Sequence, residues 1–149
     1  MGMFTNYENI PASYIPCNLK ESIACKEPYI NPMEEYNAKG EFIGYSWMYG
    51  DNVVLEFCTS GEVIFDGYYE DAETYLNGKQ LLLQLFDFRY ENIYSDQINA
   101  STSAKFYIDY EQSKQLVKGV YTCKLILIDN ENNIRYTLIN NDDCVFMVN

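Results

Sequence analysis

Acidic side chains are the most obvious candidates for catalytic chemistry in this chain. Asp and Glu together number 22, and two carboxylates that flank a cleft are the equipment of a glycoside hydrolase. No pair lies in a recognisable motif, and acids in turns are solvated surface far more often than catalysts. A hydrolase with two carboxylates is therefore kept only as the third of three hypotheses.

Other catalytic arrangements are missing from the sequence. The chain contains no histidine, so neither a Ser-His-Asp nor a Cys-His arrangement can be built within it. Neither a Walker pattern nor a Gly-x-Gly-x-x-Gly phosphate loop occurs. We therefore predict no catalytic residue, no cofactor and a non-enzymatic protein.

One stretch has the spacing of a calcium loop. Asp129, Glu131 and Asn133 alternate as EF-hand ligands do, but Ile134 stands where that loop needs Gly and Asn140 where it needs Glu. A hairpin loop is the better interpretation, and we predict no metal site.

The five cysteines indicate a reducing compartment. Their number is odd and no Cys-x-x-Cys pair occurs, which favours buried thiols that act as small hydrophobic side chains. The N-terminus lacks the basic start and apolar run of a signal peptide, and no segment has the apolar length of a membrane span. We expect synthesis and folding in the cytosol, with no membrane partner.

The net charge of -12 limits the partners of this protein. Phosphate backbones repel such a surface, and the sequence has no cluster of Lys and Arg. We therefore exclude nucleic-acid binding as a main role. Basic protein partners remain compatible with the charge.

The elements are arranged around residues 118–129, the longest run with strand chemistry. Tyr121, Cys123, Leu125 and Leu127 share one wholly apolar face at a period of two, whereas the opposite face is mixed. A strand with one dry face needs a second layer to cover it. This run therefore predicts a β-sandwich or small barrel.

Further strands are predicted at residues 41–49, 52–59, 62–66, 79–88, 104–110, 134–139 and 144–148, with residues 90–98 as a ragged continuation. Residues 69–78 and 111–117 have the pattern of short helices. The sequence thus predicts an all-β fold. We expect an antiparallel β-sandwich of about seven or eight strands, immunoglobulin-like or jelly-roll, with an extended N-terminal arm and one or two short helices.

The segment Gly119-Val120-Tyr121-Thr122-Cys123 is comparable to the tyrosine corner of immunoglobulin domains. We interpret it as a Gly turn followed by a Tyr that pins the corner of an antiparallel sandwich. It supports the architecture and does not indicate an immune function.

All four prolines lie in the first 32 residues, which divides the chain into an extended arm at residues 1–38 and a sandwich domain at residues 39–149. The arm is too apolar for an idle linker. It either wraps back on its own domain or docks on another subunit, and both alternatives stay open. The candidate docking residues are Phe4, Tyr7, Ile10, Tyr14, Ile15, Tyr29 and Ile30.

Residues 44–148 carry a series of turn and strand motifs: Tyr49-Gly50-Asp51, Leu76-Asn77-Gly78-Lys79, Phe106-Tyr107-Ile108-Asp109 and Leu116-Val117-Lys118-Gly119-Val120-Tyr121. This region resembles the immunoglobulin-like or jelly-roll modules of tailed-bacteriophage structural proteins, which occur in baseplates, head fibres and capsid decoration. The resemblance implies a protein of the virion, assembled in the host cytoplasm as a homo-oligomer with other virion proteins. The His-free composition, rich in Asn, Lys and Tyr, is consistent with an AT-rich phage genome.

The leading hypothesis is therefore a structural component of a tailed-phage virion, in the capsid, neck, fibre attachment, tail or baseplate, with the arm as the docking element. The second hypothesis is a carbohydrate- or receptor-binding module, because the chain has 15 tyrosines and one tryptophan, Trp47, and aromatic rings stack on sugars.

Overall fold

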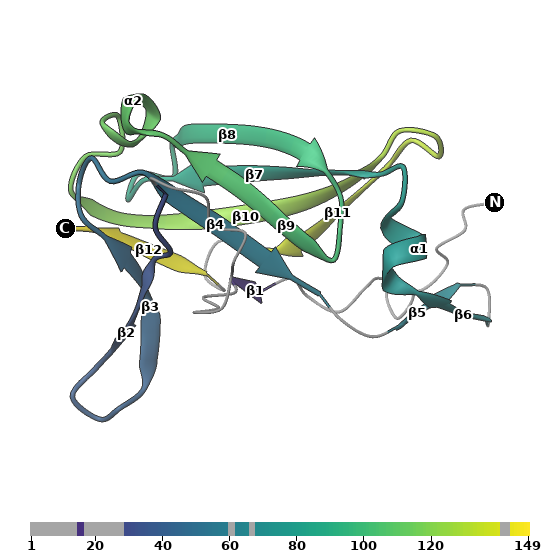
Figure 1. The fold of residues 1–149 in the computed structure, drawn as a ribbon, viewed down its shortest axis with the longest axis horizontal. Coiled ribbons are helices and arrows are strands. Elements are labelled where there is room, and N and C mark those ends of the chain that lie inside the picture. Colours follow the sequence, from purple (N-terminus) through teal and green to yellow (C-terminus); the bar gives the residue numbers. More distant parts are fainter. Residues whose placement is uncertain (1–14, 17–28, 60–61, 66–67, 141–143) are drawn as a thin grey trace.

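The computed structural model describes residues 15–16, 29–59, 62–65, 68–140 and 144–149. Strands dominate it, which confirms the predicted all-β sandwich (Figure 1). The smaller sheet has the order β1-β4-β9, formed by Ile15–Pro16, Val53–Cys58 and Ser103–Ile108. The larger sheet has the order β2-β3-β12-β10-β7-β8, formed by Met33–Tyr36, Phe42–Trp47, Val145–Val148, Gly119–Asp129, Gln80–Phe86 and Asn92–Asn99. β11 (Ile134–Ile139) also pairs with β10, and β5 (Glu62–Phe65) pairs with β6 (Tyr68–Asp71) as a separate hairpin.

The long central strand β10 has the dry face that the sequence predicts. Tyr121, Cys123, Leu125 and Leu127 are all buried. The last three pair directly with buried leucines of β7, in the register Cys123↔Leu85, Leu125↔Leu83 and Leu127↔Leu81. Side chains from two neighbouring strands therefore form one apolar floor, which must be shielded from water.

The smaller sheet supplies that shield. Leu55 and Phe57 of β4 lie opposite Phe106 and Ala104 of β9, and the rings of Phe57 and Phe106 meet edge to face with centroids 5.8 Å apart. These side chains and the apolar floor of the larger sheet belong to one buried cluster. Two layers over one core are the sandwich that the β10 pattern predicts.

Three predictions about element type need correction. Residues 69–71 belong to β6 and not to a helix, because Asp71 caps α1 (Ala72–Leu76) by accepting a hydrogen bond from the Thr74 N–H at 3.1 Å. The second helix, α2 (Tyr110–Ser113), likewise begins after a capping residue, Asp109, and ends before residues 114–117. Residues 90–98 do not continue β7, since residues 92–98 lie in the separate strand β8, which pairs back on it.

The described chain has twelve strands instead of seven or eight, with β1, β2, β6 and β8 as the additions.

Strand β3 lies between two very different neighbours. It pairs antiparallel with β2, inside the range predicted as an arm, and parallel with β12 from the far end of the chain. The register Tyr45↔Phe146 joins residues about a hundred positions apart. The β2–β3 hairpin therefore enters the sheet only through the last strand.

Beyond β12, the β2–β3 hairpin turns away from the body of the protein (Figure 1). A bulge interrupts its pairing after Glu35↔Gly44, and Gly44 has a φ of +145°. A Cβ at Gly44 would lie 2.7 Å from the Val145 carbonyl oxygen of β12. Only glycine fits this bend, because a side chain would meet both backbone strain and the neighbouring strand.

We predict that Gly44→Ala lowers the free energy of unfolding by about 2–3 kcal/mol, since it adds strain and a backbone clash. Gly40→Ala is the matched control. Its φ of +80° gives strain of about 1 kcal/mol, but open space surrounds its Cβ. Urea denaturation measures both values. Equal losses for the two variants would contradict the close packing of Gly44 on β12.

Candidate docking surface

Exposed large apolar side chains gather in two regions of the described chain. The first comprises residues 48–52, 87–91 and 109–120. These segments lie at one end of the sandwich, where β3, β7 and β9 end and β10 begins, and we call them the apolar end. The second is the β2–β3 hairpin. Apart from Ile30, the exposed set consists of Met48, Tyr49, Phe88, Tyr90, Tyr110, Val117 and Val120 at the apolar end, and Met33, Tyr36, Phe42 and Ile43 on the hairpin.

The opposite end of the sandwich carries a polar hollow, and we call it the polar end. A hollow of about 320 Å³ lies where β7 begins and β8 and β10 end, and Asn77, Lys79, Gln80, Asn99 and Asn130 contribute its polar lining. A gathering of exposed large apolar groups is the usual mark of an interaction surface. The apolar end is therefore the candidate site.

The turn between β7 and β8 is the most exposed part of the apolar end. Phe88 is 81% exposed and Tyr90 is 66% exposed. Asp87 holds the turn, since its Oδ1 accepts from the N–H of Arg89 at 2.8 Å and of Glu91 at 3.1 Å, and its own N–H donates to the Glu91 carbonyl oxygen at 3.0 Å. The two aromatic rings thus project from a fixed backbone.

The tip of the β2–β3 hairpin has the same construction. Asn37 Oδ1 accepts from the N–H of Lys39 and Glu41, and the Asn37 N–H donates to the Glu41 carbonyl oxygen. The fourth residue of that turn is Gly40, at a φ of +80°. In the β7–β8 turn, Tyr90 takes this fourth position at a φ of +60°.

Tyr90 is therefore a bulky residue where a glycine would fit with less strain. A left-handed conformation costs a residue with a Cβ about 1–2 kcal/mol. Its ring is mostly exposed, so burial does not offset this strain. Strain that persists in a displayed side chain is a reason to look for a function of that side chain.

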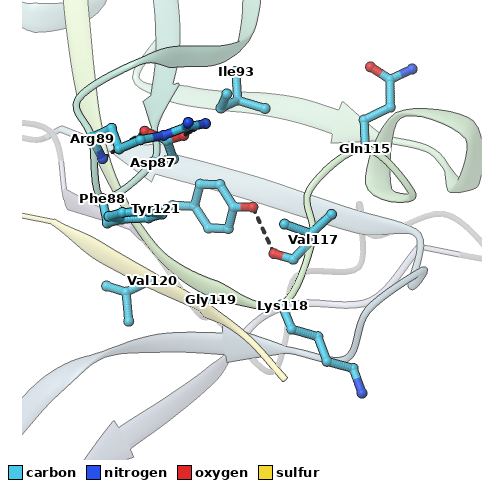
Figure 2. A pocket seen from close by; sticks show the side chains of 10 residues that line it. All are labelled: Asp87, Phe88, Arg89, Ile93, Gln115, Val117, Lys118, Gly119, Val120 and Tyr121. Atoms are coloured by element: carbon cyan, nitrogen blue, oxygen red, sulfur yellow. Dashed lines mark hydrogen bonds and ion pairs between the residues drawn. The ribbon is translucent and has the colours of Figure 1, made fainter.

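Beside the turn lies a hollow of about 180 Å³ (Figure 2). Its apolar lining includes Phe88, Ile93, Val117 and Val120, with the ring of Tyr121 between them. Arg89, Gln115 and Lys118 add polar groups. A hollow of this kind accepts an apolar side chain and offers charge at its margin.

The buried Tyr121 beside this hollow is the predicted tyrosine corner. Its hydroxyl donates to the Val117 carbonyl oxygen, four residues upstream, at 2.7 Å, which confirms the prediction (Figure 2). Burial, and next the negative charge of Asp87, raise the pKa of Tyr121, so the hydroxyl keeps the proton that it donates. The loop that carries Val117 is thereby fixed to β10.

The third loop of the apolar end is fixed as well. The Tyr49 hydroxyl donates to the Lys114 carbonyl oxygen at 2.9 Å, which joins residues 48–52 to the α2–β10 loop. The Lys114 ammonium lies over the Tyr110 ring and forms an ion pair with Glu111 at 3.1 Å. The exposed apolar groups of this end are thus held before any partner arrives, which lowers the entropy lost on binding.

The predicted arm residues lie in part on this chain itself. Ile15 pairs with Cys58 of β4, Tyr29 packs edge to face on Tyr107 with centroids 5.0 Å apart, and Ile30 forms a parallel bridge with Val53. For these three residues the described contacts are within one chain. The other four predicted docking residues, Phe4, Tyr7, Ile10 and Tyr14, lie outside the described residues.

The two buried carboxylates of the described chain have structural partners. Glu56 accepts a hydrogen bond from Ser103 and forms a cross-strand ion pair with Lys105 at 3.3 Å. Asp129 begins the β10–β11 loop and accepts from the Asn132 N–H at 3.2 Å and from its side-chain amide at 2.8 Å. The second site is the hairpin loop that the sequence predicts.

Trp47 does not take part in any docking surface. It is only 3% exposed and packs on Phe146, with ring centroids 5.5 Å apart. The sugar-stacking role considered for it from the sequence is therefore wrong. Among the described residues, the exposed aromatic rings are the tyrosines and phenylalanines of the apolar end and the hairpin.

No group of three or more His, Cys, Asp or Glu side chains in the described chain is arranged to hold a metal ion, and none of its helices has the length and apolar character of a membrane span. Comparisons with protein-family models, with curated proteins and with solved structures found no match for this chain.

We predict that Tyr90→Gly is at least as stable as the unmodified chain and about 1 kcal/mol more stable than Tyr90→Ala. The Ala variant loses the same ring but keeps a Cβ at the left-handed position. Urea denaturation of the three proteins measures the difference. If Ala and Gly gave equal stabilities, Tyr90 would not be strained.

A second prediction concerns how the stability of the fold depends on pH through Asp87. Despite the opposing effect of desolvation, the backbone N–H groups of Glu91 and Arg89 and the Arg89 guanidinium lower the pKa of Asp87 below its ordinary value. A carboxylate with a lowered pKa stabilises the fold above its ordinary pKa near 4, and that contribution is lost as the pH falls further.

The variant Asp87→Asn keeps the turn geometry, as Asn37 does in the matching turn, but removes the charge. We expect the unmodified chain to be more stable than this variant at pH 7 and the difference to fade below about pH 4. Thermal unfolding at pH 3, 5 and 7 tests it. A difference that stayed constant with pH would count against the charge of Asp87.

Proposed function

We propose that this chain is a non-catalytic structural component of a tailed-phage virion, and that it docks on neighbouring virion proteins through the apolar end. The observation that carries the docking role is the placement of Phe88 and Tyr90 on a rigid, strained turn beside an apolar hollow. Interfaces are centred on apolar anchors that are already positioned before binding.

The virion context is supported by the resemblance of residues 44–148 to phage structural modules. A two-layer sandwich with short turns also suits a rigid spacer, since fixed loops transmit position between neighbours. The net charge of -12 favours partners that are neutral or basic where they meet this protein. Docking by the arm residues Phe4, Tyr7, Ile10 and Tyr14 is part of the same proposal.

A carbohydrate- or receptor-binding role is the second candidate. It is favoured by three exposed tyrosines, Tyr49, Tyr90 and Tyr110, which belong to one end of the sandwich. Such rings stack on sugars or anchor a protein receptor. Binding on a glycan array that is lost in Tyr90→Gly would favour this role over assembly.

Incorporation into particles tests the leading proposal. We expect Phe88→Asp and Val120→Asp, each of which adds one charge to the apolar end, to reduce the number of copies per purified particle at least tenfold. Deletion of residues 1–14 tests the arm separately and is expected to lower incorporation as well. Quantitative mass spectrometry of purified particles gives the copy number.

Asn99→Asp is the control, because it adds the same charge at the polar end. It should be incorporated normally. Normal incorporation of both apolar-end variants, with folding verified by circular dichroism, would refute docking through this surface. Absence of the unmodified chain from particles would refute the virion role.

A further inference from the structure

The apolar end has both halves of a self-complementary contact. The turn with Phe88 and Tyr90 is convex and mostly exposed. The hollow beside it is concave, with Val117 and Val120 in its lining. A patch that contains a projection and a matching recess side by side fits a copy of itself turned by a two-fold axis.

The charges at the margin of this patch are also of both signs. Lys118 lines the hollow and forms no ion pair within the described chain. Glu91 and Glu111 pair with Arg89 and Lys114 of their own chain, but their side chains stay mostly exposed and can accept a second cation. A two-fold contact requires such a mixture, because the same margin must face itself. Lys118 of one copy then opposes a carboxylate of the other, which favours the correct orientation.

We propose that a second copy of this chain covers the apolar end as a two-fold dimer, with Phe88 of each copy inserted into the hollow of the other. This inference rests on the proposed function in one respect, namely that the apolar end is a docking surface. It adds the identity of the partner and the two anchors. Tyr90, held in its left-handed conformation, closes the contact beside Phe88.

The net charge of -12 on each copy opposes this dimer. At physiological ionic strength, charges more than about 8 Å apart are largely screened, so repulsion from the polar end has little effect on the contact. Burial of several exposed aromatic and aliphatic side chains then supplies the attraction.

Sedimentation equilibrium of the full chain in 0.15 M NaCl, at concentrations from about 1 µM to 1 mM, tests the proposal. The unmodified chain should dimerise in a concentration-dependent way. Phe88→Asp and Val120→Asp should raise the dimer Kd about 30-fold or more, as hot-spot residues do. Tyr90→Gly should also weaken the dimer, and because we expect this variant to be at least as stable as the unmodified chain, misfolding should not explain the loss.

Ile43→Asp is the matched control, because it places the same charge on the exposed hairpin. It should dimerise normally. A chain that stays monomeric to 1 mM overturns the proposal, and so does a dimer that all three Asp variants weaken equally. A monomer that binds phosphatidylcholine vesicles through Phe88 also overturns it, since a membrane would then be the occupant.

The particle experiment separates this inference from the proposed function. A monomeric chain whose Phe88→Asp variant is lost from particles would leave docking intact and refute the second copy. A dimer whose disruption leaves incorporation unchanged would support the second copy and refute docking on virion neighbours.

Discussion

The structure depends on the contact between the dry face of β10 and the smaller sheet. Tyr121, Cys123, Leu125 and Leu127 form this face together with the leucines of β7, and β4 and β9 cover it. Water is excluded only while both layers are present, so neither sheet can be stable alone. The loops of the apolar end join or extend these same strands, and their positions follow from this core.

At the apolar end, local hydrogen bonds instead of core packing fix the positions of the loops. Asp87 fixes one turn through backbone hydrogen bonds, Asp109 caps α2, and the Tyr121 hydroxyl holds the loop at Val117. Each of these groups satisfies backbone polar atoms that lack a strand partner. The result is an exposed apolar surface whose shape is set in advance, which is uncommon for loops and suits recognition.

The sequence predicts the core well and the surface poorly. Period-two alternation in residues 118–129 is enough to identify β10, its buried face and the tyrosine corner. The β7–β8 turn was missed because Tyr90 stands where a glycine is expected, although Asp87 and Glu91 repeat the spacing of Asn37 and Glu41. The strand β2 was missed because its partner β3 is held in the sheet by a strand from the other end of the chain. Trp47 illustrates the same limit, since composition cannot tell a buried ring from a displayed one.

The parallel pairing of β3 with β12 has a consequence for synthesis on the ribosome. Residues 42–47 leave the ribosome about a hundred residues before their sheet partner at residues 145–148. Until then β2 and β3 form an isolated two-stranded hairpin, which is marginally stable in water. Closing a loop of about a hundred residues is slow, so the hairpin should be the final part to order and the first to loosen under mild denaturant.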